Sequence, residues 1–424
     1  MSPRPHAHAD VRRSAEKQPL DVIVCGAGPA GLAVAAGLGQ AGVRVVVCGQ
    51  LPINTPEMPD RRTAALFLPS INFLKSLGVW PGLEPHCAPI TGIRMVDDTG
   101  HLLRAPEVAF MARDAGLGAI GFNCPNPEVV AALCARISEL PCVDAILGCR
   151  ITAVETGPTA ARVTIDDGLR QATLSAPLVV AADGRHSISR VAAGIGVRTW
   201  DYQQSALTAH IRHELSHHGV STEFHGPGGP CTVIPMKGNT SALVLVDRPG
   251  AVGRFSGLGP DEFRVALEAK LHGLLGSITE VSVRRVFPLT GLVAKLFGAD
   301  RTVLVGESGH AFPPIGAQGL NLGFWDAAAL VDMTVAACAK GVDPGSDTQM
   351  AAFHASRRGD VAARVFGVDT LSASLTSALA PLVLGRGAML HAAARMEPLR
   401  RYLIEQGLTS PRGLPESMRP TACV

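Results

Sequence analysis

Residues 21–31 read Asp-Val-Ile-Val-Cys-Gly-Ala-Gly-Pro-Ala-Gly, and this stretch decides the fold. The run Asp21–Cys25 is short and almost entirely apolar, which predicts a strand buried on both faces. The GxGxxG pattern follows, and the small apolar residues 32–38 have helical character. A second apolar run, Val43–Cys48, predicts the next strand of a parallel sheet. The chain therefore begins with a β-α-β unit, which indicates an α/β fold.

Each glycine of this pattern has a physical role in dinucleotide binding. Gly26 permits the tight turn, Gly28 lets a pyrophosphate approach the backbone, and Gly31 allows the helix to pack closely on the strand. The helix N-terminus offers free N–H groups and a partial positive charge to the phosphates. In this context we favour dinucleotide binding over a plain tight turn.

The end of the second strand departs from the usual pattern. An acidic residue there normally binds the adenosine ribose, but this chain has Gly49 followed by Gln50. The departure weakens the case for NAD in a site of this kind and leaves adenosine anchoring open even for FAD. Gln50 is equally well interpreted as a ribose ligand or as a residue of a solvated turn.

Composition narrows the class of protein further. Of the 424 residues, 47% are hydrophobic and 17% are charged, so the chain can build a sizeable core and is not intrinsically disordered. A net charge of +2 argues against nucleic-acid binding as its main role. The ten cysteines are scattered without a CxxC pair, which indicates a reduced, cytoplasmic protein without a cysteine-based zinc site.

Neither end of the chain predicts a membrane-spanning segment. Residues 1–19 lack the apolar core of a signal peptide, and we interpret them as a disordered tail. The apolar segment Thr370–Gly385 is shorter than a spanning helix and contains Pro381. A buried or subunit-contacting helix is favoured there, with peripheral membrane contact as the alternative.

The rest of the pattern predicts a second sheet inserted into the first domain. Helices are expected at Pro69–Leu77 and from Asn126, as a capping residue, to about Leu140. A hairpin is expected around residues 161–168 and buried strands at 178–182 and 302–305. Several short β runs between Ser205 and Val246 predict a mostly antiparallel sheet, and most of the chain after Leu320 has helical character.

Two further motifs follow buried strands. One is Ala-Asp-Gly-Arg-His-Ser at 182–187, and the other extends from Val305 through the Gly-Glu-Ser-Gly-His run at 306–310 to Asn321. The glycines and prolines of the second motif shape a loop whose following helix aims its N-terminus at a ligand. Taken alone, either motif is explained at least as well by a structural turn.

Together and in this order, the three motifs resemble those of the FAD-dependent aromatic hydroxylases, the class A flavoprotein monooxygenases. The stretches 60–66, 77–80 and 312–323 are similar to the ubiquinone-biosynthesis branch of that family. The resemblance covers about residues 19–408. It implies a Rossmann-like FAD-binding domain, an inserted β-sheet substrate domain and C-terminal helices.

The resemblance also implies roles for individual residues. The FAD diphosphate would lie on Gly26, Ala27, Gly28, Pro29, Ala30 and Gly31. Arg62 would reach a phosphate or ribitol oxygen, Asn126 would lie near the cofactor, and Asp183 would lie by the diphosphate. Gly306 and Glu307 would bind the ribitol, although many relatives have Asp where this chain has Glu307. The flavin ring would be lined by Pro314, Gly316, Gly319, Leu320 and Asn321. The backbone N–H groups of Gly319 to Asn321 would stabilise the reduced, anionic flavin.

On this basis we divide the chain into alternating parts. Residues 20–85, 121–200 and 291–345 are predicted to bind FAD, and residues 86–120 and 201–290 to form the substrate domain. Residues 346–424 are predicted to form C-terminal helices.

Two histidine patterns point to other chemistry. His310 could act as a base, but we favour a histidine that pins its loop by hydrogen bonds. His213-Glu214-Leu215-Ser216-His217 spells the zinc-protease pattern HExxH, which requires a helix. Here a strand precedes it and Gly219 follows at once, so a solvated hairpin loop is favoured and no metal site is predicted.

The leading hypothesis is an FAD-dependent monooxygenase that hydroxylates a polyprenylated phenol of ubiquinone biosynthesis with O₂ and NAD(P)H. Such an enzyme would be cytoplasmic, with contacts to the inner membrane face and to other quinone-biosynthesis enzymes as further expectations. The alternative is a hydroxylase of a soluble aromatic or secondary metabolite. A non-catalytic flavin-binding subunit and a zinc hydrolase are less favoured interpretations.

Overall fold

The computed structural model describes residues 19–55, 59–100, 106–313, 318–376, 391–392, 395–408 and 413–420. The predicted disordered tail, apart from Pro19, lies outside these residues, as does the apolar segment beyond Thr376. The predicted flavin-lining residues Pro314 and Gly316 also lie outside them.

A parallel sheet carries the first motif, as the opening stretch predicted. Its described strands run in the order β19–β20–β12–β1–β2–β8, and every pair from β20 to β8 is parallel. The strands β1, β2 and β12 are buried along their whole length, which explains their continuous apolar sequences. The bounds are β1 (Val22–Cys25), β2 (Val45–Gly49), β8 (Val143–Leu147), β12 (Leu178–Ala181), β19 (Gly298–Ala299) and β20 (Thr302–Leu304).

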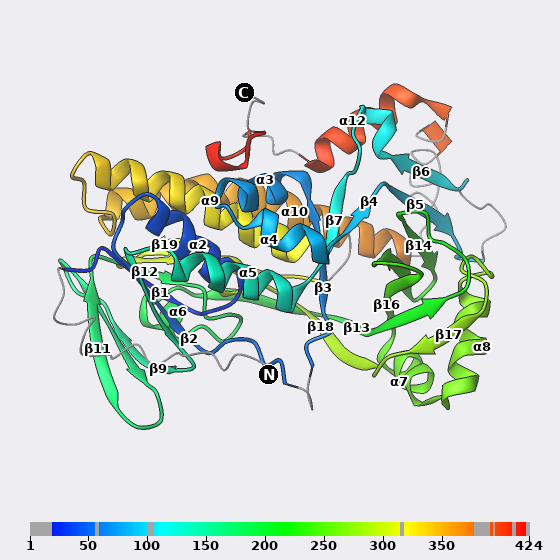
Figure 1. Ribbon diagram of the computed structural model, residues 1–424, viewed down its shortest axis with the longest axis horizontal. Helices are drawn as coiled ribbons and strands as arrows, with labels where there is room; N and C mark the ends of the chain where they lie inside the picture. The colour runs from blue at the N-terminus through cyan, green and yellow to red at the C-terminus, as the bar shows by residue number, and fades with distance from the viewer. Residues whose placement is uncertain are drawn as a thin grey trace.

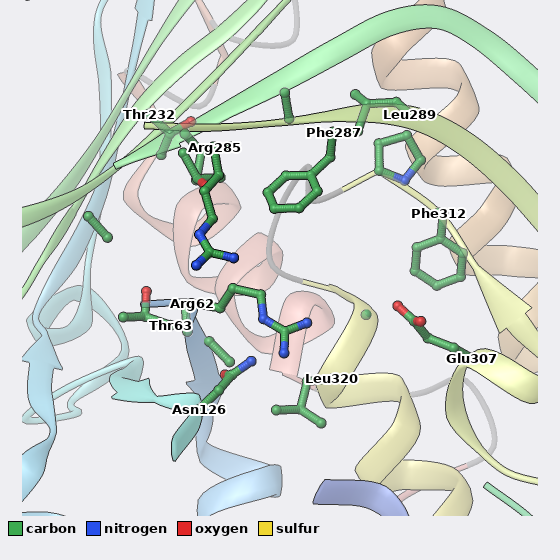
Figure 2. A pocket seen from close by; sticks show the side chains of 18 of the residues that line it. Arg62, Thr63, Asn126, Thr232, Arg285, Phe287, Leu289, Glu307, Phe312 and Leu320 are labelled. Atoms are coloured by element: carbon green, nitrogen blue, oxygen red, sulfur yellow. The ribbon is translucent and has the colours of Figure 1, made fainter. Parts of the chain in front are cut away.

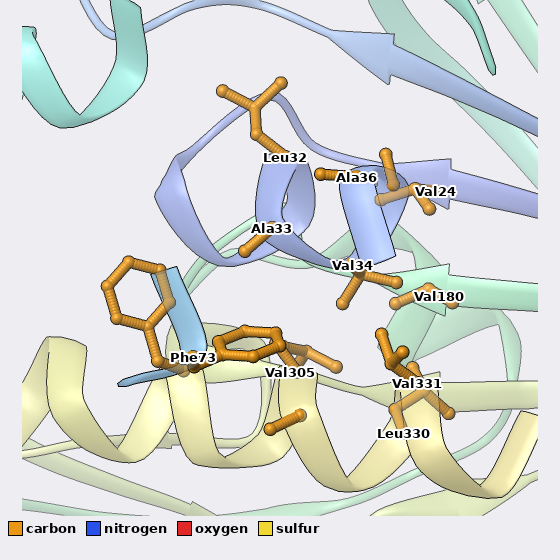
Figure 3. Close-up of a cluster of buried hydrophobic side chains, with 14 of the residues drawn as sticks. Val24, Leu32, Ala33, Val34, Ala36, Phe73, Val180, Val305, Leu330 and Val331 are labelled. Atoms are coloured by element: carbon orange, nitrogen blue, oxygen red, sulfur yellow. The ribbon is translucent and has the colours of Figure 1, made fainter. Parts of the chain in front are cut away.

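Helices cover one face of this sheet (Figure 1). They are α2 (Pro29–Gln40), α5 (Asn126–Ser138) and α9 (Gln318–Ala339). Figure 3 shows Val34 of α2 near Val180 of the sheet and Val331 of α9. A Cβ added at Gly37 would lie 2.8 Å from a methyl carbon of Val331, so this glycine lets α2 and α9 approach closely.

The helix α9 is long and apolar enough to span a membrane, but it packs inside the molecule. Of its most apolar window, 61% is buried against the rest of the protein. Core helices of globular proteins have the same composition, so the pattern is only weak support for a membrane span.

A small antiparallel sheet covers the opposite face. Its strands are β9 (Arg150–Glu155), β10 (Ala161–Asp166) and β11 (Gln171–Ala176). The predicted hairpin is confirmed by β10 and β11, which are joined by the turn around Gly168. Buried side chains between the two sheets, including Ile23, Val46 and Val163, form a second core.

The predicted second sheet is confirmed as a large, mostly antiparallel one (Figure 1). Its described strands run β21–β18–β13–β16–β15–β14–β5–β6, with β17 beside β13 and one parallel pair, β14 with β5. The helices α7 (Pro249–Gly257) and α8 (Pro260–Lys270) cover one face. The strand bounds are β5 (Gly92–Asp97), β6 (Val108–Met111), β13 (Val197–His213), β14 (Val220–Gly226), β15 (Gly229–Pro235), β16 (Thr240–Asp247), β17 (Ile278–Val281), β18 (Arg285–Ala294) and β21 (His310–Ala311).

Two strands reach from one sheet region to the other. Along β13, Val197 packs against the core of the parallel sheet, whereas Leu207 and Ile211 lie in the core under α7 and α8. The strand β18 follows β13 over most of this length, with an irregularity between Asp201 and Ser205. The boundaries expected near residues 200 and 290 therefore fall inside continuous strands.

The remaining elements join these layers. A third small sheet has the order β3–β7–β4, with β3 (Thr63–Phe67), β4 (Ala88–Ile90) and β7 (Gly121–Pro125). The helix predicted at 69–77 is confirmed as α3 (Leu68–Ser76). The others are α4 (Trp80–Leu83), α6 (Ile188–Ala192), α10 (Asp347–Thr376) and α12 (Glu397–Leu408), with 3₁₀ turns η1 (Glu84–His86), η2 (Ala112–Ala115), η3 (Gly306–Ser308) and η5 (Glu416–Met418).

The prediction that Asn126 caps a helix is wrong. The helix α5 has Pro125 in the capping position without a side-chain cap, and Asn126 is its first helical residue. The reason is that the backbone N–H of Asn126 donates to the carbonyl of Arg62, which ties the helix start to the segment before β3. The helix also ends at Ser138, earlier than expected.

Candidate functional site

The first two motifs meet at Gly26. This residue has φ +124°, and a Cβ built on it would lie 2.1 Å from the carbonyl oxygen of Ala182. A Cβ on Gly31 would lie 2.1 Å from the carbonyl oxygen of Gly26, so the helix start packs directly on the turn. Among the described residues, no atom lies within 4 Å of a Cβ built on Gly28. The turn is therefore closed around Gly26 and Gly31 and open at Gly28, the position expected to face a pyrophosphate.

The third motif docks onto the same place. A Cβ on Gly306, where φ is +64°, would lie 3.5 Å from the Cβ of Ala30. The Ser308 hydroxyl donates to the carbonyl of Ala181 at 2.5 Å, and Arg190 donates to the carbonyl of Ser308 at 2.7 Å. The three motifs, which are far apart in the sequence, thus form one continuous surface at the carboxyl ends of β1, β12 and β20.

The structure gives a reason for glycine at position 49. Its φ is +142°, and a Cβ built there would lie 3.1 Å from the Cα of Gly26. The end of β2 is therefore pressed against the first glycine of the turn, where a side chain would crowd the backbone. Gln50 is exposed beside it.

A cavity of about 1170 Å³ lies between the third motif and the face of the large sheet opposite α7 and α8. Figure 2 shows several of its lining side chains, with Arg62 between Asn126 and Glu307 in this view and Leu320 below. Much of the wall is apolar, including Ile90, Ile93, Ile234, Phe287, Leu289 and Phe312. The cavity exceeds the roughly 300–1,000 Å³ of an ordinary ligand pocket, so it can hold a large cofactor ring together with a second aromatic molecule.

Arg62 and Asn126 bring polar groups to this cavity. Arg62 makes two side-chain hydrogen bonds to the carboxylate of Asp60, at 2.8 and 2.7 Å. Burial would raise the pKa of Asp60, but its hydrogen bonds to Arg62 and the charge of that guanidinium hold the pKa below its usual range. The side-chain oxygen of Asn126 is buried and has no hydrogen-bond partner in the described part of the chain, so an acceptor is available beside the cavity.

Of the remaining predicted residues of the third motif, some line the cavity and one does not. Glu307 lines the cavity and forms an ion pair with Arg185 at 3.4 Å. Gly319 and Leu320 line it from the first turn of α9. The side chain of Asn321 instead holds the start of α3, because its oxygen accepts from the backbone of Phe67 at 2.9 Å.

The carboxylate of Asp183 accepts hydrogen bonds from residues of the second motif and the helix that follows it. One carboxylate oxygen accepts from the hydroxyl of Ser187 at 2.5 Å. The other accepts from the backbone N–H and the hydroxyl of Ser189, both at 3.1 Å. These bonds fix the turn at the start of α6, next to Arg185 and Arg190, which line the cavity.

His310 lies away from the cavity, in a buried ion cluster. Its Nε2 is 2.6 Å from Oδ2 of Asp326, which also accepts from the backbone N–H of Gly306 at 3.0 Å. The other oxygen of Asp326 accepts from Arg357 at 2.8 Å. Burial would raise the pKa of Asp326, but the charges of His310 and Arg357 hold the pKa below its usual range. The cluster joins the third motif to α9 and α10.

The HExxH segment is not helical. His213 is the last residue of β13, and a turn follows it, so the predicted loop is confirmed. The predicted solvated hairpin is wrong, because β14 pairs with β15 and β5 rather than with β13, and His213 is buried. Its ring nitrogens lie 2.8 Å from the carbonyl of Leu215 and 2.9 Å from the hydroxyl of Ser241. Burial lowers the pKa of His213, so the ring is held neutral for these bonds.

A polar group on the sheet wall of the cavity was not predicted from the sequence. Glu223 of β14 lines the cavity, as do Ser221 on the same strand and Thr232, its partner on β15. Its carboxylate lies 3.2 Å from Nε2 of His225. The sequence does contain a pattern that indicates this polar face: residues 221, 223 and 225 are polar and alternate along a strand, so they share one of its faces.

The residues present fit FAD. The turn is open where a diphosphate would approach, the start of α2 directs free N–H groups there, and the cavity beside α9 has room for the ring. Gly26–Gly31 would hold the diphosphate, and the first turn of α9 would face the flavin.

Comparisons with known proteins agree with this arrangement. The model of the family described as FAD binding domain matches residues 19–366. The ubiquinone hydroxylase UbiL of Rhodospirillum rubrum is 33% identical over 420 residues, covering 98% of this chain and 95% of that protein. The 3-demethoxyubiquinol 3-hydroxylase of Escherichia coli is 28% identical over 396 residues, covering 92% and 99%. The crystal structure of p-nitrophenol 4-monooxygenase PnpA from Pseudomonas putida superposes with a TM-score of 0.74 at 20% identity, covering 92% of this chain and 98% of that one.

Proposed function

The chain belongs to the FAD-binding family and is an FAD-dependent monooxygenase, and from this premise we propose that it hydroxylates the aromatic ring of a polyprenylated ubiquinone precursor. The match to UbiL extends over nearly the full length of both proteins, so it includes the substrate sheet as well as the cofactor fold.

One observation carries the proposal. The three motifs of the cofactor fold converge beside a cavity of about 1170 Å³ whose far wall is the face of the large sheet opposite α7 and α8. That wall is rich in apolar side chains, and two of the residues at the cavity, Val283 and Phe287, are also exposed, at 68% and 39%. A ring inside the cavity with an apolar chain leaving past these residues fits this geometry.

In the proposed reaction the protein binds the cofactor and the substrate, orients the substrate ring and excludes water. FAD, when bound, passes electrons from NAD(P)H to O₂ and supplies one oxygen atom to the substrate. The first turn of α9 would hold the flavin ring by backbone contacts, and Arg62, Asn126 and Glu307 would bind polar parts of the cofactor. The apolar wall would exclude water from the reacting ring.

We also propose where the enzyme acts. A polyprenylated substrate partitions into membranes, so the enzyme would work from the cytoplasm at the inner membrane face and contact other enzymes of quinone biosynthesis. The exposed apolar residues at the cavity support this placement.

The test combines three measurements: bound FAD, enzymatic turnover, and complementation of a hydroxylase-deficient strain. The purified protein should carry FAD, oxidise NAD(P)H in the presence of a prenylated phenol, and yield a product heavier by one oxygen atom. Expression should restore ubiquinone in a strain lacking a ubiquinone hydroxylase, with quinone intermediates followed by mass spectrometry. Turnover of soluble phenols without complementation would favour the alternative, a hydroxylase of a soluble aromatic metabolite. A flavin that is never reduced by NAD(P)H would refute both.

A further inference from the structure

Of the two described carboxylates that line the cavity from the large sheet, Asp201 of β13 is exposed to solvent, whereas Glu223 lies on the inner wall. Glu223 of β14 lines the cavity, and its side chain is 13% exposed. Its neighbour across the strands is Thr232 of β15, and the next residues in the same row are Val244 of β16 and Thr208 of β13. All of them line the cavity, so the carboxylate lies in a row with two hydroxyls on an otherwise largely apolar surface.

This carboxylate is held in place by a buried histidine. Nε2 of His225 lies 3.2 Å from Oε2 of Glu223, and the His225 side chain is only 4% exposed. The two residues are separated by one position on the same strand, so both point to the same face of the sheet. Among the described ion pairs, the one made by Glu223 is with this histidine and involves no lysine or arginine.

Placing a carboxylate there is costly for the fold. Moving a charged group out of water into an apolar cavity is unfavourable unless it is well paired, and one histidine at 3.2 Å is modest compensation. Titratable groups retained at such positions in a ligand cavity are often functional. Asp60, Asp183 and Asp326 each accept several hydrogen bonds that hold a turn or a helix in place, whereas the described partner of the Glu223 carboxylate is one histidine on its own strand.

We propose that Glu223 accepts the proton of the substrate's phenolic hydroxyl, that His225 orients this carboxylate, and that Thr232 hydrogen-bonds the same oxygen. This inference rests on the proposed function, and it names the catalytic base that the hydroxylation uses. The phenolic O–H bond breaks, an O–H bond forms on the carboxylate, and the oxygen's electron pair moves into the ring.

The chemistry explains why a carboxylate is sufficient. An ordinary phenol has a pKa of about 10, so a carboxylate does not remove its proton from the resting substrate. When the ring gives an electron pair to the incoming oxygen atom, the phenolic proton becomes far more acidic and passes to the hydrogen-bonded carboxylate. One atom of O₂ forms the new C–O bond and the other leaves as water, with two electrons from NAD(P)H as in the proposed function. The attacked ring carbon releases its hydrogen as a proton when the ring becomes aromatic again, so no further reactant is needed.

The test compares two matched substitutions in the holoenzyme. Glu223→Gln removes the base and keeps the shape, whereas Glu280→Gln makes the same change at a 70% exposed position on β17 of the same sheet. With 2-geranylphenol as substrate, Glu223→Gln should lower the rate of product formation at least about 100-fold, because general bases contribute about 10²–10⁴-fold. FAD content and NAD(P)H oxidation should persist, so electrons are lost to hydrogen peroxide. Glu280→Gln should match the wild type.

Two further measurements separate a chemical role from a structural one. A ring-fluorinated 2-geranylphenol, whose hydroxyl is more acidic, should restore part of the Glu223→Gln rate, and a merely structural defect would not respond. In flavin-absorbance titrations the unsubstituted enzyme should bind 2-geranylphenol about tenfold more tightly than its methyl ether, a preference that needs no variant to measure.

The outcomes are distinct. Full product formation by Glu223→Gln, or equal binding of phenol and ether by the unsubstituted enzyme, would overturn the assignment of Glu223 and leave the proposed function intact. If the unsubstituted enzyme hydroxylates no phenol at all, the proposed function itself fails.

Discussion

Replacing Asp326 by Asn should destabilise the protein strongly, although the two side chains have nearly the same shape. Asp326 is fully buried in α9 and accepts hydrogen bonds from three places: the backbone of Gly306, His310 and Arg357. An amide has one acceptor oxygen and one donor nitrogen, so at least one of the three donors loses its partner. The charge of Arg357 also loses one of its two carboxylates and keeps Asp360, at 2.7 Å.

The size of the effect follows from this geometry. Removing one partner of a buried ion pair costs about 3–5 kcal/mol, and the retained bond to Asp360 places the loss at the lower end, about 3 kcal/mol. Because Gly306 is one of the donors, the same change should loosen the third motif and weaken FAD binding. Urea titrations of the holoprotein at saturating FAD measure the first effect, and FAD titrations of the apoprotein measure the second.

The matched control is Asp261→Asn, which changes an 85% exposed carboxylate paired with Arg264 on α8. Exposed ion pairs contribute about 0–1 kcal/mol, so this variant should stay close to the wild type in both assays. An Asp326→Asn variant that is as stable as the control would refute the view that the cluster holds the motif in place.

Gly28→Ala should lower the free energy of unfolding by no more than about 1 kcal/mol, because the added methyl group meets no described atom within 4 Å but alanine is a poorer N-cap residue than glycine, yet weaken FAD binding where the diphosphate approaches; unchanged FAD affinity relative to Gly253→Ala, also in open space, would contradict this role. Gly31→Ala should instead lower stability by more than about 2 kcal/mol, since its Cβ would lie 2.1 Å from the carbonyl of Gly26; thermal melts of the apoprotein check this. Burial holds the pKa of His213 below 6.5, so near pH 6 the unfolded chain binds more protons than the folded one, and its contribution to stability is present above pH 6.5 and lost as pH falls toward the folded-state pKa. Urea midpoints between pH 5 and 8 should therefore fall less steeply with acid in His213→Gln than in the wild type.

Much of the fold could be predicted because its deciding features are local. The buried strand 178–181 is recognisable from four consecutive apolar residues, and the first turn from the spacing of its glycines. The helix start at Asn126 was misjudged because the preceding Pro125 takes the extended capping position. That outcome depends on a hydrogen bond to Arg62, which is distant in sequence.

The site was harder to predict from the sequence, because the walls of the cavity come from different sheets. Polar residues alternating along 221–225 have the same pattern as a solvated strand, and only the helices α7 and α8 on the other face show that they point inward. Asp326 was a visible exception within the apolar helix 318–339, but its partner Arg357 lies on another helix and has no sequence signal of its own.

The long strands β13 and β18 have a consequence for how the protein unfolds. Val197 at one end of β13 and Ile211 near the other belong to separate hydrophobic cores, and the two strands are paired between them. Neither half can unfold without breaking hydrogen bonds between β13 and β18, and the other half depends on the same strand pair. The enzyme should therefore denature in one cooperative step, and protease cuts in its surface turns should leave nicked chains that stay together rather than release an independent cofactor or substrate module.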